Sequence, residues 1–320
     1  MLTLSIVIPV YKGEKSIGAL TDTLIMSLSD KYKLEILLVC DFSPDNSEAV
    51  GIELFKKYPD VVKFYSLAKN VGEHNAVMAG LNQSTGDWVV IMDDDFQNPV
   101  SEVVKLVDFA KDSNYDVVYS YYDEKRHSFF RNFGSWINDK FANVMLKKPR
   151  DLYLSSFKIM NRFLVNEVIR YTSPYPYIDG IILNTTGSIG KIKLEHHARQ
   201  AGKSGYTLKK LISLWLNMFT NFSVLPLRIS ALLGFIFAVI GFIIGIEVVF
   251  EKFFNSSLPP GYALVFIIFS VFTGIQLIAI GMVGEYLGRM FLSQNKKPQF
   301  TIRRAFTKDE PQKAEKSQSV

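Results

Sequence analysis

The sequence predicts an α/β domain with a mainly parallel sheet, followed by two transmembrane helices. Short β-branched runs alternate with helix-like segments over the first two thirds of the chain, and two long stretches without charge lie in the last third. The mean hydropathy of +0.13 is high for a soluble enzyme. The 320 residues are 48% hydrophobic and 21% charged, which excludes a disordered, collagen-like or coiled-coil chain.

Charge and cysteine content exclude further classes of protein. The 36 Lys and Arg residues stand against 31 Asp and Glu residues, which leaves a formal charge of +5. This excess is mild, and we expect no nucleic-acid partner. The single cysteine, Cys40, excludes a disulfide framework and a cysteine-built zinc site.

The first strand is expected at residues 4–10 (LSIVIPV), a β-branched run that Pro9 closes, and the second at residues 35–40 (EILLVC). Each is followed by a polar turn and a helix-like segment, and the same alternation continues along the domain. Continuous apolar strands that alternate with helices favour a parallel sheet covered on both faces. Further strands are expected at residues 61–66, 87–92 and 116–121, and helices at residues 16–29, 47–57, 73–83 and 101–112.

Two uncharged stretches, residues 229–246 (ISALLGFIFAVIGFIIGI) and 258–284 (LPPGYALVFIIFSVFTGIQLIAIGMVG), are each long enough to cross about 30 Å of hydrocarbon as a helix. The loop between them carries few charges, whereas their outer flanks are rich in Lys and Arg. By the positive-inside bias, both termini and the large N-terminal domain are expected in the cytoplasm. Residues 1–13 lack the basic leader and cleavage site of a signal peptide. We therefore expect a two-pass integral membrane protein.

The segment between the soluble domain and the first uncharged stretch has two interpretations. Residues 208–228 mix basic, aromatic and aliphatic side chains, which fits an amphipathic juxtamembrane helix and equally the last helix of the soluble domain. We expect the charged end of the tail, from residue 307, to be disordered. The expected order is a soluble domain (1–207), a juxtamembrane helix (208–228), a first transmembrane helix (229–250), a non-cytoplasmic loop (251–261), a second transmembrane helix (262–288) and a cytoplasmic tail (289–320).

Acidic residues follow two of the expected strands. Asp41 comes directly after EILLVC, and WVVIM ends in Asp93, Asp94 and Asp95. Three adjacent carboxylates repel one another, and a divalent cation would relieve the repulsion. Oxygen ligands without a nearby cysteine favour Mg²⁺ or Mn²⁺, which commonly bridge substrate phosphates. A solvated acidic loop that binds nothing is the alternative. There is no GxGxxG after the first strand and no GxxxxGK[ST], which disfavours a dinucleotide site and a P-loop.

Seven segments in a fixed order resemble the family 2 glycosyltransferases, and within them the polyprenyl-phosphate glycosyltransferases. The resemblance covers roughly residues 3–305 and includes the positions of the two membrane helices. The segments are SIVIPVYKGEKSI, CDFSPDNS, LAKNVGEHNAVMAGL, MDDDFQNP, SSFKIMNR, RQAGKSGYTLKKL and GMVGEYLGRMF followed by KKPQF.

The resemblance implies a GT-A fold with a Rossmann-like sheet and assigns roles to individual residues. Asp93 and Asp95 would be the carboxylates of a DxD-type motif that binds Mg²⁺ or Mn²⁺, with Asp95 as the direct ligand. Asp41 would pair with the base of the nucleotide. The remaining residues implied at the nucleotide sugar are Pro9, Tyr11, Glu14, Asn70 and Asp94, and those implied at the acceptor phosphate are Arg199, Lys203, Ser204, Tyr206 and, more weakly, Arg131.

Three departures from the family pattern affect these roles. Phe42 stands where a glycine is usual and Cys40 where an aspartate often is, so the base pocket is expected to be reshaped. Lys12 and Gly13 replace the usual Asn-Glu. Ser156 stands where bacterial glucosyltransferases of this type often carry an aspartate proposed as the catalytic base.

The last departure leaves the catalytic base unassigned. Asp151, five residues before Ser156, is the one substitute for the missing aspartate, and both positions are kept among the catalytic candidates. We expect that no base is needed, because the second pKa of a phosphate monoester is about 6 and the acceptor is already largely a dianion at pH 7.

The resemblance implies an inverting, metal-dependent hexosyltransferase. It would move a sugar, first of all glucose from UDP-glucose, onto undecaprenyl phosphate in the bilayer, giving a β-linked lipid sugar for envelope glycan modification. A mannose, N-acetylhexosamine or amino-sugar donor is the alternative within this reaction. An inactive membrane scaffold and a lipid transporter are the alternatives outside it. The glycine-rich membrane helices and the resemblance make a homo-oligomer plausible.

Overall fold

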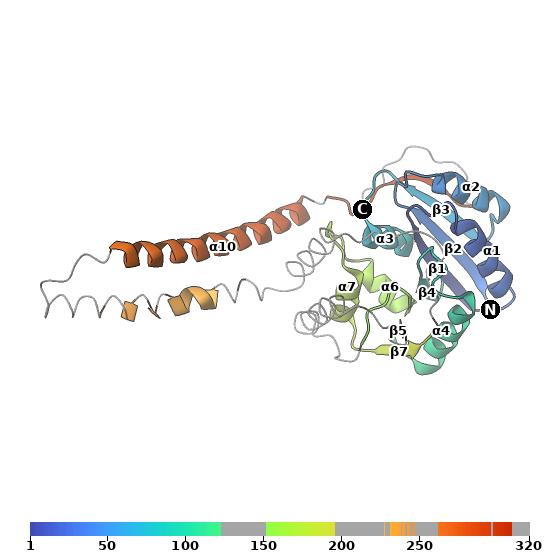
Figure 1. Cartoon of the computed structure of the whole chain (residues 1–320). Coiled ribbons are helices and arrows are strands. Elements are labelled where there is room, and N and C mark those ends of the chain that lie inside the picture. Colours follow the sequence, from blue (N-terminus) through green and yellow to red (C-terminus); the bar gives the residue numbers. More distant parts are fainter. Residues whose placement is uncertain are drawn as a thin grey trace, which may run out of the picture. The chain divides into compact units, whose positions relative to one another are not determined.

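The computed structural model describes residues 1–122, 152–195, 227, 231–237, 239–240, 242–243, 246, 262–295 and 297–308. The chain divides into two units (Figure 1). The first consists of Met1–Leu211 together with Lys296–Val320, and the second of Ile212–Asn295.

One mixed sheet runs through the first unit, with its described strands in the order β7-β5-β6-β4-β1-β2-β3-β8. The four strands at its centre, β4, β1, β2 and β3, run parallel, whereas β6 is antiparallel to both of its neighbours and β8 is antiparallel to β3. The strands are β1 (Thr3–Val10), β2 (Lys33–Cys40), β3 (Val62–Leu67), β4 (Trp88–Ile91), β5 (Val117–Tyr121), β6 (Lys158–Asn161), β7 (Ile189–Lys193) and β8 (Ile302–Phe306).

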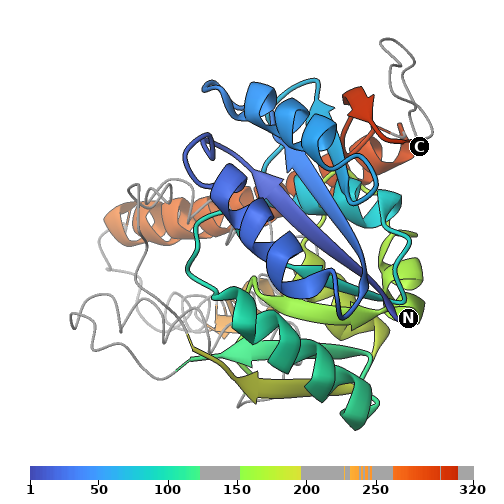
Figure 2. The same ribbon diagram turned by 90° about the vertical axis from the view of Figure 1, so that its right-hand side faces the viewer.

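Helices cover both faces of this sheet. Figure 2 looks onto the face that carries α1, α2 and α4, and Figure 1 shows α3, α6 and α7 on the opposite face. Both faces of the central strands are consequently buried, and β2 has a single exposed residue at its beginning. This is the reason that these strands read as continuous apolar runs in the sequence. The helices are α1 (Ile17–Leu28), α2 (Ser47–Lys57), α3 (Glu73–Gln83), α4 (Val100–Ser113), α6 (Arg162–Val168) and α7 (Ile178–Thr185).

The mainly parallel sheet is confirmed, and each strand and helix expected in the soluble domain lies within two residues of its predicted ends. The sequence did not indicate β6, β7 or β8. β6 has four residues, β7 (IGKIK) is polar at alternate positions, and β8 (IRRAF) carries two adjacent arginines. Each of these segments becomes a strand by pairing with one that is distant in sequence, so its local pattern is weak.

The strand β8 lies in the segment after the second membrane helix and ends just before residue 307, where disorder is expected. Its residue Phe306 packs with ring centroids 6.0 Å from both Phe55 of α2 and Phe64 of β3. Just before the strand, the side chain of Gln299 donates hydrogen bonds to the backbone oxygens of Tyr171 (2.7 Å) and Ser173 (2.8 Å). The segment 299–306 is therefore part of the folded domain.

We expect Phe306→Ala to destabilise the soluble domain by about 2 kcal/mol, because it removes a packed aromatic side chain at the sheet edge. The midpoint of urea unfolding, followed by circular dichroism of the full chain in detergent, measures this loss. Arg303→Ala, which changes an exposed position of the same strand, is the control and should leave the midpoint unchanged. An equal loss in both variants would contradict a packing role for the ring.

The second unit contains the helix α10 (Tyr262–Gln294). In the described part of the chain, one helical segment, Phe272–Leu292, is long and apolar enough to cross a membrane, with a mean hydropathy of 1.3. Large apolar side chains such as Phe269, Leu277 and Phe291 are exposed along α10, as expected of a surface that faces lipid. The helix ends six residues beyond the predicted 288. Of the predicted first transmembrane helix, 229–250, residues 231–237, 239–240, 242–243 and 246 are described and are helical, and the others lie outside the described residues.

Candidate active site

The predicted site residues follow the carboxyl ends of the central strands. β1 ends at Val10, β2 at Cys40 and β4 at Ile91, and these three parallel strands are neighbours in the order β4-β1-β2. The loops that carry Tyr11, Asp41 and Asp93 therefore leave the same edge of the sheet. In open α/β sheets this edge is where ligands bind.

Asp41 is buried and holds the loop before α3. One carboxylate oxygen accepts the backbone N–H of Val71 (2.8 Å) and the other that of Gly72 (2.9 Å), while its backbone oxygen accepts the side-chain amide of Asn70 (3.0 Å). Burial raises the pKa of the Asp41 carboxyl, and the two backbone donors oppose this shift. Each carboxylate oxygen keeps a second lone pair, which could accept a hydrogen bond from the base of a nucleotide. The pairing of Asp41 with the base stays a prediction.

Hydrogen bonds join the loop after β1 to the loop after β2. The predicted nucleotide residue Glu14 takes part through its carboxylate, which accepts a backbone donor, and through its own N–H. These bonds hold the loop after β1 and the loop after β2 in fixed positions relative to each other. They are Lys12 N–H to Ser43 Oγ (2.8 Å), Gly13 N–H to Ser47 Oγ (3.0 Å), Glu14 N–H to Asp45 Oδ2 (3.2 Å) and Asn46 N–H to Glu14 Oε2 (3.0 Å).

The three predicted aspartates occupy different surroundings. Asp93 accepts a hydrogen bond from Ser156 Oγ at 2.7 Å, and Asp95 Oδ1 accepts the N–H of Gln97 at 3.1 Å. Asp94 lies against the loop after β1, where a Cβ on Gly13 would be only 2.3 Å from Asp94 Oδ2. The glycine at position 13 therefore lets the acidic loop, which consists of Asp93, Asp94 and Asp95, approach the loop after β1.

The antiparallel strand β6 brings Ser156 to this loop. Ile91 of β4 is paired with Lys158 of β6, so two steps further along each strand Ser156 lies beside Asp93. The sequence places Ser156 where related enzymes often carry an aspartate, and the structure shows that its hydroxyl is a donor to Asp93. A second carboxylate at this position would repel Asp93.

The acidic loop concentrates negative charge. Burial, together with the carboxylates of Glu73 and Asp95, raises the pKa of Asp93 to about 6. In the described ranges, no three His, Cys, Asp or Glu side chains come together to hold a metal ion by themselves. Two carboxylates that repel each other at a strand end nevertheless fit a hard divalent cation whose other ligands are substrate oxygens.

A buried ion pair begins two residues after Ser156, at the start of β6. Lys158 is 5% exposed and its ammonium contacts Asp179 of α7, which also accepts a hydrogen bond from the hydroxyl of Tyr119 at 2.9 Å. The positive charge of Lys158 lowers the pKa of Asp93 and so opposes the effect of burial. This lysine therefore helps to keep the acidic loop ionised.

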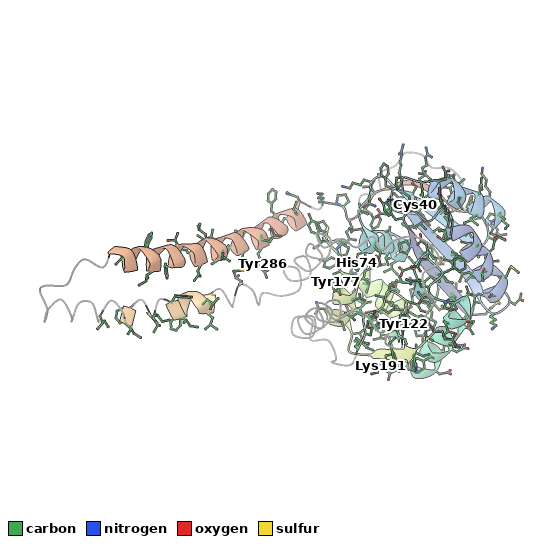
Figure 3. All side chains as sticks on the ribbon, in the orientation of Figure 1. Cys40, His74, Tyr122, Tyr177, Lys191 and Tyr286 are labelled. Carbon is green, nitrogen blue, oxygen red and sulfur yellow. The ribbon has the colours of Figure 1, made fainter. Side chains whose placement is uncertain are left out.

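An aromatic pair lies next to this ion pair. His74, at the start of α3, meets the ring of Tyr177 edge-on at a centroid distance of 5.3 Å (Figure 3). Burial lowers the pKa of His74 to about 4, so its imidazole is neutral at pH 7. A neutral imidazole can both donate and accept a hydrogen bond.

Residues 5–169 of the chain match Glycosyl transferase family 2. The chain belongs to this family. It is 31% identical over 317 residues to the undecaprenyl-phosphate 4-deoxy-4-formamido-L-arabinose transferase of Proteus mirabilis, which covers 97% of this chain and 95% of the relative. The transferase of the same name from Klebsiella pneumoniae is 30% identical over 321 residues, with 98% and 97% covered.

The fold of this family 2 glycosyltransferase is also seen in a solved structure. Glucosyl-3-phosphoglycerate synthase from Mycobacterium tuberculosis, in complex with Mn²⁺, uridine diphosphate and phosphoglyceric acid, matches with a TM-score of 0.50. The identity is 18%, and the match covers 68% of this chain and 75% of that chain. At this identity the likeness concerns the fold alone, and it agrees with the GT-A fold that the resemblance implied.

Several predicted site residues of this glycosyltransferase lie outside the described residues. They are Asp151 among the catalytic candidates, and Arg131, Arg199, Lys203, Ser204 and Tyr206 at the acceptor phosphate.

Sequence reasoning missed the group beneath the acidic loop, which consists of His74, Lys158, Tyr177 and Asp179. One signal was present, because a lysine inside the short apolar segment FKIM is unusual for a buried strand. Its partner Asp179 is distant in sequence and could not be identified without the fold.

Proposed function

We propose that this family 2 glycosyltransferase transfers a sugar from a nucleoside diphosphate donor to undecaprenyl phosphate, with inversion at the anomeric carbon. The observation that carries this proposal is the similarity to undecaprenyl-phosphate transferases over nearly the whole of both chains. Similarity confined to the soluble domain would be compatible with many different acceptors. The similarity observed here also covers the apolar segments, which would contact a lipid.

The donor sugar is proposed to be an amino sugar. The expectation of glucose from UDP-glucose is not supported, because both relatives are named for 4-deoxy-4-formamido-L-arabinose. The amino-sugar alternative fits these relatives, and we propose an N-acylated 4-amino sugar as the first donor to test.

The acidic loop is proposed to bind the diphosphate of the donor. Asp95 and Asp93 would hold Mg²⁺ or Mn²⁺, which supplies positive charge that stabilises the leaving nucleoside diphosphate. Ser156 orients the Asp93 carboxylate through its 2.7 Å hydrogen bond. The positive charge of Lys158 lowers the pKa of that carboxyl and so favours its ionised form.

No general base is required in this reaction. The second pKa of the acceptor phosphate is about 6, so its oxygen is already a nucleophile at pH 7. The chain then has to position this phosphate and desolvate it, and we propose that Arg131, Arg199, Lys203, Ser204 and Tyr206 do so. Arg and Lys side chains suit a phosphate monoester because they combine charge with several hydrogen-bond donors.

The membrane arrangement is part of the proposal. We propose two transmembrane helices, with the catalytic domain and both termini in the cytoplasm, and assembly into a homo-oligomer. The helix Phe272–Leu292 supports one of these spans, and the basic residues that flank both uncharged stretches support the orientation.

Transfer of label tests this function. Purified full-length protein in detergent, with Mg²⁺ or Mn²⁺ and undecaprenyl phosphate, should move radioactive sugar from one nucleotide donor into the organic phase. The donor panel should contain 4-amino-4-deoxy-L-arabinose nucleotides with and without the formyl group, UDP-glucose, UDP-N-acetylglucosamine and GDP-mannose. We expect the formylated amino sugar to be the fastest donor, and chelation of the metal to abolish transfer.

Two results would contradict the proposal. Transfer to a soluble acceptor but not to undecaprenyl phosphate would show that the lipid is not the substrate. Failure with every donor, while the protein is folded and a related transferase is active in the same assay, would favour the inactive-scaffold alternative. Transfer of glucose or mannose alone would correct the donor and keep the reaction.

A further inference from the structure

Phe42 adopts a backbone conformation that phenylalanine rarely takes. Its φ of 49° lies in the left-handed region, where the Cβ crowds the backbone of an L-residue. Its side chain is 50% exposed, so burial of the ring does not compensate for this strain. Strained residues of this kind persist where their surroundings hold them, and they cluster at ligand sites.

The neighbours of Phe42 hold this conformation from both sides. Asp41 before it is tied by its carboxylate to the N–H groups of Val71 and Gly72. Ser43 after it accepts the N–H of Lys12 at 2.8 Å. The strain is therefore built into the loop, and it sets the direction in which the ring leaves the sheet edge.

A second exposed aromatic ring lies on the neighbouring strand end. Val10 of β1 is paired with Cys40 of β2, so Tyr11 and Asp41 are the next residues of two adjacent parallel strands. Such strands are about 4.8 Å apart. Tyr11 is 47% exposed, and Phe42 follows Asp41 directly. Two half-exposed aromatic residues and the buried Asp41 thus follow two adjacent strand ends, at the edge of the sheet where ligands bind.

A flat aromatic heterocycle with polar edges fits this combination of groups. One of its faces would stack on an aromatic side chain, and its polar edge would form hydrogen bonds with polar groups of the loops after β1 and β2, near Asp41. We infer that Phe42 stacks on the nucleobase of the donor and determines much of the affinity for it. This inference rests on the proposed function, because it places the nucleoside of the proposed donor against this ring.

The ring and the strained backbone at position 42 should affect thermal stability separately. Replacing Phe42 by Gly removes the ring and also the backbone strain, whereas replacing it by Ala removes the ring and keeps the strain. Both variants should therefore bind nucleotide equally weakly. The Gly variant should unfold at a temperature about 2 °C above that of the Ala variant.

Calorimetric titration of the full chain in detergent with Mn²⁺ and either UDP or GDP tests the inference. We expect Phe42→Ala and Phe42→Gly each to weaken binding of the nucleoside diphosphate about tenfold, and Phe42→Tyr to retain it. Inorganic pyrophosphate, which has no base, should bind all variants as it binds the wild type. Phe163→Ala removes a phenylalanine that is 58% exposed on α6, at the opposite edge of the sheet, and is the matched control.

The outcomes separate this inference from the proposed function. Wild-type affinity for both nucleotides in Phe42→Ala would overturn the inference and leave the proposed function intact. Equal weakening of pyrophosphate and nucleotide would also overturn it, because the ring would then act through the loop and not through the base. A wild-type chain that binds neither nucleotide would overturn the inference together with the proposed function.

Discussion

Asp95→Asn is expected to lower the rate of sugar transfer about 1,000-fold or more. The substitution removes the charge that the acidic loop would direct at the donor diphosphate, while the side chain keeps its shape and can still accept the N–H of Gln97. Loss of one electrostatic group aimed at a developing charge commonly costs two to three orders of magnitude, and loss of metal binding adds to this. Steady-state transfer of label, together with Mn²⁺-dependent binding of nucleotide, measures the effect.

Two control variants make this result specific. Asp87→Asn removes the same charge from the opposite end of the same strand, where Asp87 accepts the N–H of Thr3, and should keep the wild-type rate. Asp151→Asn should retain a measurable rate, because no general base is expected. If Asp151→Asn were folded, bound donor and were as inactive as Asp95→Asn, the mechanism without a base would be wrong.

Lys158→Met is expected to destabilise the soluble domain by about 3–5 kcal/mol. The substitution leaves the carboxylate of Asp179 buried without its ammonium partner, which costs far more than the ion pair contributes when both groups are present. Urea unfolding of the full chain, followed by circular dichroism, measures this loss. We also expect the transfer rate to fall, because Asp93 loses the positive charge that favours its ionised form.

The double variant Lys158→Met/Asp179→Asn tests the cause of this loss. It removes both charges and keeps an oxygen that can accept the hydroxyl of Tyr119, so it should recover at least half of the lost stability. Lys57→Met breaks an ion pair whose side chains are 54% and 38% exposed, and it should leave the free energy of unfolding nearly unchanged because solvent screens this pair. No recovery in the double variant would show that the cost arises from altered packing.

The central strands and their helices could be predicted because their local sequence contains the information. Each of β1 and β2 is buried on both faces, so an unbroken apolar run marks it, and a helix with its own periodicity follows. The strands β6, β7 and β8 could not be predicted, because their stability comes from partners far away in the chain. β8 is held by β3 and by two phenylalanines, although its own residues are largely polar.

The sequence by itself determined which residues lie at the carboxyl edge of the sheet, because parallel strands present their ends together. Asp41 and Asp93 were assigned to strand ends at that edge, and the family resemblance placed Tyr11 with them at the nucleotide. Only the tertiary structure decided what each of them contacts. Asp41 binds the loop before α3, and Asp93 receives a hydrogen bond from Ser156, which lies just before a strand that the sequence did not reveal. Strand ends follow from local periodicity, whereas hydrogen bonds and charge at the site depend on segments that meet only when the sheet forms.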